Sequence, residues 1–350
     1  MADIHIRTEG RAGRITLNRP KALNALTWKM CLEIETALDT WRDDDAVALV
    51  IIDAEGDRAF CAGGDIQEMY DTARAGDFGY GRRFWADEYR LNAKIGAYPK
   101  PYIAFMQGFT MGGGVGVSCH GSHRIVCETS QIAMPECSIG LVPDVGGSHL
   151  LARAPGRLGE YFGLTAARMG PGDALHTRFA SHYISRDRWP ALMGHLADSG
   201  DAHLVKIFAD SEPAPPPGPA QLARPLIDAA FAAGSVPEIL ATITGDAPAI
   251  LQDAARAMER NSPLSMGATL ELIRAARATP GLAPALTREY RFTWRSAEQG
   301  DFIEGIRAAI IDKDRNPHWR LGLEQVTEAR IQAMLAPLGA DELRLEGTTT

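Results

Sequence analysis

The 350-residue sequence contains few cysteines and no long apolar run. Its five cysteines are an odd number, and none of them belongs to a Cys-x-x-Cys pair. This pattern excludes a dense disulfide framework and favours reduced thiols in a cytoplasm-like compartment. No stretch approaches the roughly 18 consecutive apolar residues that a membrane span requires. The first residues, Met-Ala-Asp-Ile-His, also lack the basic and apolar segments of a signal peptide. We therefore expect a soluble cytoplasmic protein.

Basic residues are fewer than acidic residues. The chain has 36 lysines and arginines against 44 aspartates and glutamates, which gives a formal net charge of -8. A balance of this sign argues against nucleic acid or an anionic membrane as the main partner. It leaves room for a phosphorylated small molecule that a few local cations hold.

Several common catalytic motifs are missing. The sequence has no G-x-x-x-x-G-K-[ST] phosphate loop, and a dinucleotide G-x-G-x-x-G fails because Val117 and Cys119 stand where its third glycine is required. No G-x-S-x-G is present, so Ser118 is not predicted to be a nucleophile. His120 and His123 have no H-E-x-x-H context, and we predict no metal site.

The first half of the chain is predicted to contain both helices and strands. Helical spacing of apolar residues begins after Thr27, which is the predicted N-cap of a helix. The continuous β-branched and aliphatic run at 47–52 predicts a strand buried on both faces. A second buried strand is expected at 102–106. A strand, a helix and a further strand in this order indicate an α/β layer architecture.

The second half is predicted to be mostly helical. Residues 166–184 suggest two helices joined by a turn at 170–172, and the proline-rich segment 212–219 suggests a linker or exposed loop. We expect a core over residues 1–185, a helical region over 186–345 and a disordered tail over 346–350.

Two carboxylates follow the most glycine-rich part of the chain. A short strand at 131–134 leads into Glu136, and Asp144 comes eight residues later. Carboxylates near exposed backbone N–H groups suggest chemistry on a carbonyl that becomes an oxyanion. Two alternatives stay open: the stretch could be a turn with solvated acids, or Asp144 could cap a helix that begins near Val145.

The combination of motifs resembles the crotonase (enoyl-CoA hydratase/isomerase) superfamily. The resemblance is carried by A-F-C-A-G-G-D-I at 59–66, G-F-T-M-G-G-G-V-G at 108–116 and M-P-E at 134–136. Within that superfamily, E-Y-R-L-N at 88–92, I-G-L-V-P-D-V-G-G at 139–147 and E-G-I-R-A-A-I-I-D-K-D at 304–314 resemble the branch of 3-hydroxyisobutyryl-CoA hydrolases, which act in valine degradation. The likeness covers about residues 10–340.

This resemblance implies a fold as well as a ligand. The expected fold is a crotonase-type α/β spiral core, built from repeated strand–strand–helix turns, followed by a mostly helical C-terminal region. The implied partner is an acyl-CoA, in which coenzyme A is part of the substrate and no separate cofactor is needed. Some family members form homo-oligomers, and the sequence leaves the oligomeric state open.

Site residues follow from the resemblance position by position. The backbone N–H groups of Gly64 and Gly113 would form the oxyanion hole around the thioester carbonyl. Glu136 would be the principal catalytic carboxylate, and Asp144 and Glu88 would line the polar side of the acyl pocket. Contacts with coenzyme A and the rest of the substrate would come from Lys21, Ala22, Ala62, Asp65, Ile66 and Gly112, with Lys21 or another cation near the phosphates.

One departure from the hydratase pattern bears on the reaction. Enoyl-CoA hydratases of this family place a second glutamate at the position of Gly116, which supplies no carboxylate here. The sequence therefore predicts an acyl-CoA thioester hydrolase that uses Glu136 and Asp144. Two alternatives are an enoyl-CoA hydratase or isomerase, and a non-catalytic protein that binds CoA thioesters.

Overall fold

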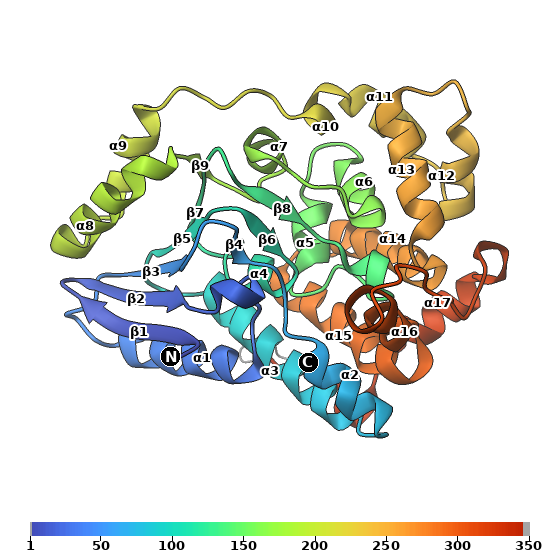
Figure 1. Ribbon diagram of the computed structural model, residues 1–350, viewed down its shortest axis with the longest axis horizontal. Coiled ribbons are helices and arrows are strands. Elements are labelled where there is room, and N and C mark those ends of the chain that lie inside the picture. The colour runs from blue at the N-terminus through green and yellow to red at the C-terminus, as the bar shows by residue number, and fades with distance from the viewer. Residues whose placement is uncertain (1, 346–350) are drawn as a thin grey trace. The chain divides into compact units, whose positions relative to one another are not determined.

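The computed structural model describes residues 2–345 (Figure 1). They form two compact units, each made of three segments of the chain. The first unit comprises Met1–Gly64, Arg90–Ala133 and Arg168–Gly218, and the second comprises Asp65–Tyr89, Met134–Ala167 and Pro219–Thr350. All nine strands of the described chain lie in the first unit. The prediction of mixed α/β structure followed by helices is confirmed, whereas the division at residue 185 stays a prediction. The predicted disordered tail, 346–350, lies outside the described residues.

A six-stranded sheet forms the larger part of the first unit. Its strand order is β1-β2-β3-β5-β7-β9, in which β1 and β2 pair antiparallel and every other pair is parallel. All six residues of β3 are buried, as the aliphatic run at 47–52 predicts. The strands are β1 Ile4–Glu9, β2 Ala12–Leu17, β3 Leu49–Ala54, β5 Tyr102–Met106, β7 His123–Val126 and β9 His182–Tyr183.

The two glycine-rich turns follow strands of a second sheet, which consists of three short parallel strands. Its order is β4 (Ala59–Cys61), β6 (Phe109–Met111) and β8 (Gln131–Ala133). The carboxyl ends of these strands continue as Ala62-Gly63-Gly64, Gly112-Gly113 and Met134-Pro135-Glu136. Ligand sites of parallel sheets lie at this end of the strands.

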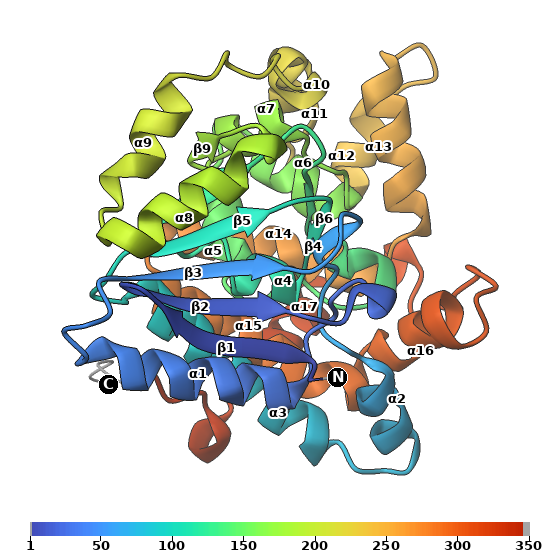
Figure 2. The same cartoon turned by 60° about the vertical axis from the view of Figure 1, so that its left-hand side comes forward.

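Helices cover the six-stranded sheet of the first unit. Helix α8 (Trp189–Ser199) and helix α9 (His203–Asp210) pack on one face, where Trp189 and Leu192 meet Phe105 and Ile51 in a fully buried cluster (Figure 2). The indole N–H of Trp189 donates to the Ile184 carbonyl at 2.9 Å. A large aromatic side chain is thus buried with its polar atom satisfied.

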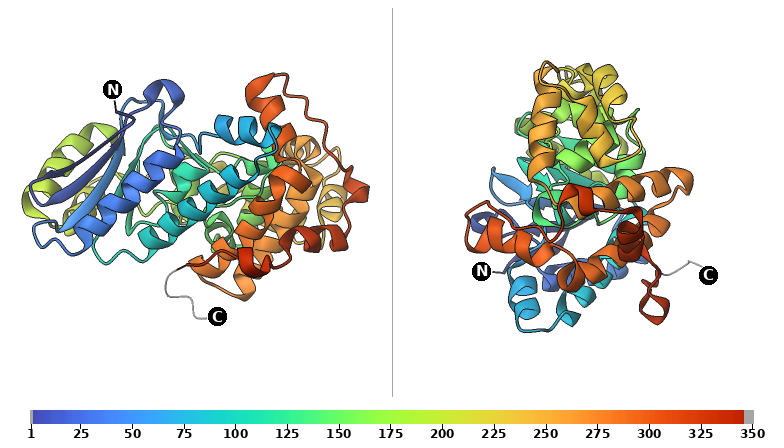
Figure 3. Two further views of the ribbon diagram at one scale, coloured as in Figure 1. Left: turned by 90° about the horizontal axis from the view of Figure 1, so that it is seen from below. Right: turned by 90° about the vertical axis from the view of Figure 1, so that its right-hand side faces the viewer.

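Helix α1 (Trp28–Arg42) and the last residues of helix α3 (Gly79–Gly96) lie side by side (Figure 3). Ion pairs join the two helices. The side chain of Thr27 caps α1 by accepting from the Met30 N–H, as the sequence predicts. Arg90 and Lys94 of α3 pair with Glu35 of α1 at 2.8 and 3.0 Å. The first unit also contains α4 Gly113–Gly116 and α7 Pro171–His176.

The second unit is an assembly of helices around the buried helix α14 (Pro263–Ala278). This helix packs against α5 (Gly147–Ala152), α6 (Leu158–Thr165) and α15 (Leu282–Gln299). The remaining helices are α2 Gln67–Arg74, α10 Pro219–Leu222, α11 Arg224–Ala230, α12 Val236–Thr242, α13 Ala249–Arg260, α16 Phe302–Ile306 and α17 Glu328–Leu335.

Three local expectations can be compared with these elements. Within 166–184 the first predicted helix is wrong, because residues 166–170 form no helix. The second is confirmed only over Pro171–His176, which is α7, and the chain then forms the short strand β9. All five cysteines are buried and outside disulfide bonds, as predicted. Among the described residues, no helix has the length and apolar character that crossing a membrane requires.

Candidate active site

Two glycine turns of the first unit approach each other closely. A Cβ atom on Gly114 would lie 2.3 Å from the Cys61 carbonyl oxygen, so α4 packs against the end of β4 with no room for a side chain. Gly112 adopts φ 48° and ψ -120° at the start of α4, a conformation that favours glycine. The N–H groups of Gly64 and Gly113 make no hydrogen bond with the described residues. Both donors are therefore available to a carbonyl oxygen.

The predicted coenzyme A contacts of the first unit lie beside the same turn. The 3-10 helix η1 (Pro20–Ala22) leads into Leu23, whose carbonyl accepts from the Ala62 N–H at 3.0 Å. The Leu26 N–H donates to the Gly63 carbonyl at 2.9 Å. Lys21 is exposed and forms no ion pair within the described chain. Its ammonium group is free to meet a phosphate.

Four buried acids gather in the second unit. Glu88 comes from α3, Glu136 begins the 3-10 helix η2 (Glu136–Ile139), Asp144 lies in the loop before α5, and Glu289 comes from α15. Each is at most 5% exposed, and none forms an ion pair within residues 2–345. Buried charges are normally paired, so a cluster of unpaired acids is a candidate functional site.

The geometry of Asp144 excludes the helix-cap alternative. Helix α5 begins at Gly147 and its N-cap is Gly146, without a side-chain cap. The carboxyl group of Asp144 instead accepts the hydroxyl of Tyr89 at 2.6 Å. The residue that follows, Val145, has φ 51°, which turns the chain out of helical geometry before α5 starts.

Burial raises the pKa values of these acids, and repulsion between neighbouring charges raises some of them further. Burial raises the pKa of Glu136 well above its usual range, and the charge of Asp144 raises it further. The same two causes raise the pKa of Glu88. Burial also raises the pKa of Asp144 to about 6, although the hydrogen bond from Tyr89 opposes that shift. Carboxylates with raised pKa values are effective general bases near neutral pH.

Two carboxyl oxygens of this cluster lack partners. Glu136 Oε2 and Glu88 Oε1 are buried and make no hydrogen bond with the described residues. Leaving a buried acceptor unsatisfied costs about 1–3 kcal/mol. Unsatisfied buried oxygens of this kind occur at sites where a substrate or an ordered water supplies the missing donor.

The remaining predicted residues are placed as follows. Asp65 and Ile66 are half-buried in the second unit, where Ile66 is the N-cap of α2. Gly116 is the last residue of α4 and is buried. The structure thus brings Glu88, Glu136 and Asp144 together in the second unit and the predicted glycine donors together in the first. The catalytic and binding roles of these residues stay predictions.

The sequence alone assigns no role to Tyr89 or Glu289. Tyr89 was visible as the neighbour of Glu88 in a motif that the resemblance uses, but nothing indicated its hydrogen bond to Asp144. Glu289 stands three residues after Leu286 and three before Phe292, so it falls among apolar residues of α15. An acid on the apolar side of a predicted helix is the signal that could have found it.

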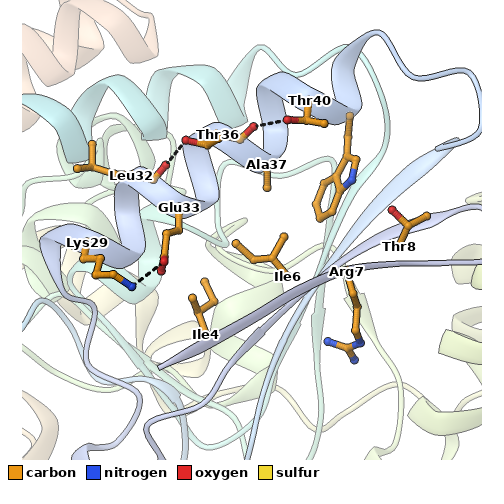
Figure 4. A pocket seen from close by; sticks show the side chains of 11 residues that line it. Ile4, Ile6, Arg7, Thr8, Lys29, Leu32, Glu33, Thr36, Ala37 and Thr40 are labelled. Carbon is orange, nitrogen blue, oxygen red and sulfur yellow. Dashed lines mark hydrogen bonds and ion pairs between the residues drawn. The ribbon is translucent and has the colours of Figure 1, made fainter. Parts of the chain in front are cut away.

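A surface groove elsewhere in the first unit carries none of the predicted site residues. It has a volume of about 580 Å³ and lies between β1 and α1 (Figure 4). Ile4 and Ile6 point toward its interior, and Lys29 pairs with Glu33 at 2.7 Å on its rim. The lining is largely apolar and Lys29 and Glu33 neutralise each other, so this groove offers no catalytic group.

Comparisons with known proteins agree on the family. Residues 12–335 match the family model described as enoyl-CoA hydratase/isomerase. The chain is 36% identical to the mitochondrial 3-hydroxyisobutyryl-CoA hydrolase of Gallus gallus, over 98% of this chain and 91% of that protein. It is 39% identical to the protein of the same name from Xenopus tropicalis, over 96% of this chain and 89% of that one.

Solved structures give the same result. A crystal structure described as an enoyl-CoA hydratase from Rhodobacter sphaeroides 2.4.1 matches with a TM-score of 0.94 and 52% identity, and the match covers 98% of this chain and all of that one. Fold, motifs and relatives are consistent over nearly the whole sequence. The chain belongs to the enoyl-CoA hydratase/isomerase family, the crotonase superfamily.

Proposed function

We propose that this protein is an acyl-CoA thioester hydrolase that converts 3-hydroxyisobutyryl-CoA and water into 3-hydroxyisobutyrate and coenzyme A. The observation that carries the proposal is the buried pair of Glu136 and Asp144, found in a chain that has glycine at position 116. Full-length similarity to relatives of that name supports the substrate. Coenzyme A belongs to the substrate, and no further cofactor is required.

The glycine donors bind the oxygen on which negative charge develops. As the thioester carbonyl becomes tetrahedral, its oxygen accepts from the N–H groups of Gly64 and Gly113. These donors are fixed at the ends of a sheet and do not reorganise during the reaction. One such donor contributes about 3 kcal/mol to transition-state stabilisation.

Glu136 supplies the base or the nucleophile. Its carboxylate either attacks the thioester carbon or removes a proton from the attacking water, and both routes require the ionised form. A pKa raised by burial makes that carboxylate more basic than an exposed glutamate. Asp144, held by Tyr89, and Glu88 orient the water and the hydroxyl of the acyl group.

The substitution Glu136→Gln tests this assignment. Glutamine keeps the size of the side chain and removes its basic oxygen, so we expect kcat for thiol release to fall at least about 100-fold. Binding of a non-hydrolysable 3-hydroxyisobutyryl-CoA analogue should change less than threefold. A variant that keeps more than about a tenth of wild-type kcat would refute the role of Glu136.

Enoyl-CoA hydration is the second candidate function. It is favoured by the 52% identity to a structure described as an enoyl-CoA hydratase. The absence of a carboxylate at Gly116 counts against it, because the family's hydratases use two glutamates to hold the water. A third candidate, binding of CoA thioesters without turnover, is opposed by the shifted, unpaired carboxyls, which a simple binding site does not need.

A further inference from the structure

We infer that Glu289 is a positioning residue for the hydrolysis, acting by holding the loop that carries Asp144. This inference rests on the proposed function and adds a residue that does not itself touch the substrate. Glu289 lies near the middle of α15, far along the chain from the catalytic motifs, and is completely buried. Its carboxyl group faces the backbone of the loop between η2 and α5.

Three hydrogen bonds converge on the Glu289 carboxylate. Oε2 accepts the Gly146 N–H at 2.7 Å, and Oε1 accepts the Ser148 N–H at 2.9 Å. The Ser148 hydroxyl also donates to Oε1. No ion pair forms at Glu289 in the described part of the chain. The donors come from Gly146 and Ser148, at the junction of the loop with α5. A buried acid in this position is placed to fix the shape of that junction.

The loop needs such a restraint because its conformation is strained. Val145 has φ 51° and Gly146 has φ 81°, so two consecutive residues adopt left-handed backbone geometry. A β-branched side chain rarely takes that geometry, and strained residues persist only where the surrounding structure enforces them. The strained valine directly follows Asp144, and the Gly147 N–H closes the turn on the Asp144 carbonyl at 2.6 Å.

Helix α15 also restrains the side chain of Asp144, through Tyr89. Tyr89, which donates to the Asp144 carboxylate, is itself 3.4 Å from the hydroxyl of Thr293. Thr293 lies one helical turn after Glu289, so the two residues occupy the same face of α15. One helix face therefore supports both the backbone and the hydrogen-bond donor that orient Asp144.

A carboxylate suits this position better than an amide. It offers only acceptor oxygens, and all three groups that point at it are donors. Glutamine would turn its NH₂ group toward at least one of those donors and lose that hydrogen bond. The loop would then leave its strained conformation, and Asp144 would move away from the position that the reaction requires.

The test compares Glu289→Gln with Glu160→Gln in the full-length protein. Glu160 is the control because it is also completely buried and lies in α6 of the same unit. Its ion pairs are with Arg157 and Arg277, and neither residue belongs to the loop that carries Asp144. Both variants should lower the thermal midpoint. Steady-state thiol release from 3-hydroxyisobutyryl-CoA is measured at a temperature where both remain folded.

We expect Glu289→Gln to lower kcat at least tenfold with KM changed less than threefold, while Glu160→Gln keeps kcat within twofold. Amide hydrogen exchange over residues 144–148 should quicken at least tenfold in Glu289→Gln alone. Ser148→Ala, which removes one of the three donors, should give a smaller loss of kcat. The Ser148→Ala variant also provides a test if Glu289→Gln does not fold.

Two results would overturn the inference. One is a folded Glu289→Gln protein, or a folded Ser148→Ala protein if the former is unstable, whose kcat equals that of the wild type. The other is unchanged amide exchange over 144–148. Failure of the proposed function would look different: the wild type itself would release no thiol, while exchange over the loop would still report whether Glu289 holds it.

Discussion

The carboxyl group of Asp144 is buried without an ion pair among the described residues, and a hydrogen bond from Tyr89 and one from the backbone stabilise its charge. Burial raises its pKa from the ordinary 3.8 to about 6. The folded state therefore binds a proton more tightly than the unfolded state does. Its contribution to stability is present at pH below about 4 and is lost as pH rises toward and through about 6.

This shift predicts a pH-dependent effect of Asp144→Asn. Asparagine cannot ionise, so the variant avoids the cost of a buried charge above pH 6. We expect its thermal midpoint to match that of the wild type at pH 4.5 and to exceed it by a few degrees at pH 7.5. Thiol release should nevertheless fall at least tenfold at pH 7.5. Equal activity in the two proteins would remove Asp144 from the mechanism.

The hydroxyl of Tyr89 gives a second prediction at this scale. Its hydrogen bond favours the ionised form of Asp144 and lowers that residue's pKa. Tyr89→Phe removes the donor, so the pKa of Asp144 should rise above about 6. If ionised Asp144 is needed for hydrolysis, the acidic limb of the kcat profile should move to higher pH. A pH titration of kcat in both proteins checks the shift, and an unmoved limb would contradict it.

Among the elements, α16 supports the segment that carries Glu136. A Cβ atom on Gly305 of α16 would lie 2.1 Å from the carbonyl oxygen of Ile139, the last residue of η2. A Cβ atom on Gly140 would lie 2.5 Å from the backbone of Asp301. Glycine at both positions allows backbones to approach at a distance that any side chain would prevent.

We therefore expect Gly305→Ala to displace η2. The thermal midpoint should drop by several degrees and kcat for thiol release should fall, because Glu136 begins the displaced helix. Gly194→Ala is the matched control: Gly194 lies in helix α8, with nothing within 4 Å of an added Cβ atom. The control should be neutral or slightly stabilising. Similar midpoints for the two variants would contradict the close contact between α16 and η2.

The sequence was most informative where regular spacing governs structure. The buried run at 47–52 and the helix after Thr27 were predicted because apolar periodicity and a side-chain cap are local properties. Strand β9 was not, because its two residues are too few to show a pattern. The loop from Asp144 to Gly147 could not be predicted either. Its left-handed residues depend on Glu289, more than 140 positions away in sequence.

At the scale of the whole molecule, the motifs of the family located the glycine donors and three of the buried acids. The glycines, Glu136 and Asp144 are recognisable because their spacing is fixed by strand ends and short turns, whereas Glu88 lies on helix α3 and was indicated by the resemblance alone. The two supporting residues, Tyr89 and Glu289, are not recognisable in this way. A tyrosine or a glutamate on a helix is ordinarily a core or surface residue, and only the tertiary structure shows its hydrogen bonds to the loop.

Location in the cell is a further whole-molecule property. The few cysteines predicted a cytoplasmic protein, and that location remains a prediction. The animal relatives carry the word mitochondrial in their names, so the relatives do not support it.

The central claim is that the buried carboxyl pair hydrolyses a thioester and does not hydrate a double bond. The most direct test uses one preparation of the full-length protein with two substrates. Thiol release is followed with 3-hydroxyisobutyryl-CoA, and loss of absorbance is followed with crotonyl-CoA. We predict a kcat/KM for hydrolysis at least 100-fold greater than that for hydration. Efficient hydration of crotonyl-CoA without thiol release from 3-hydroxyisobutyryl-CoA would contradict the account.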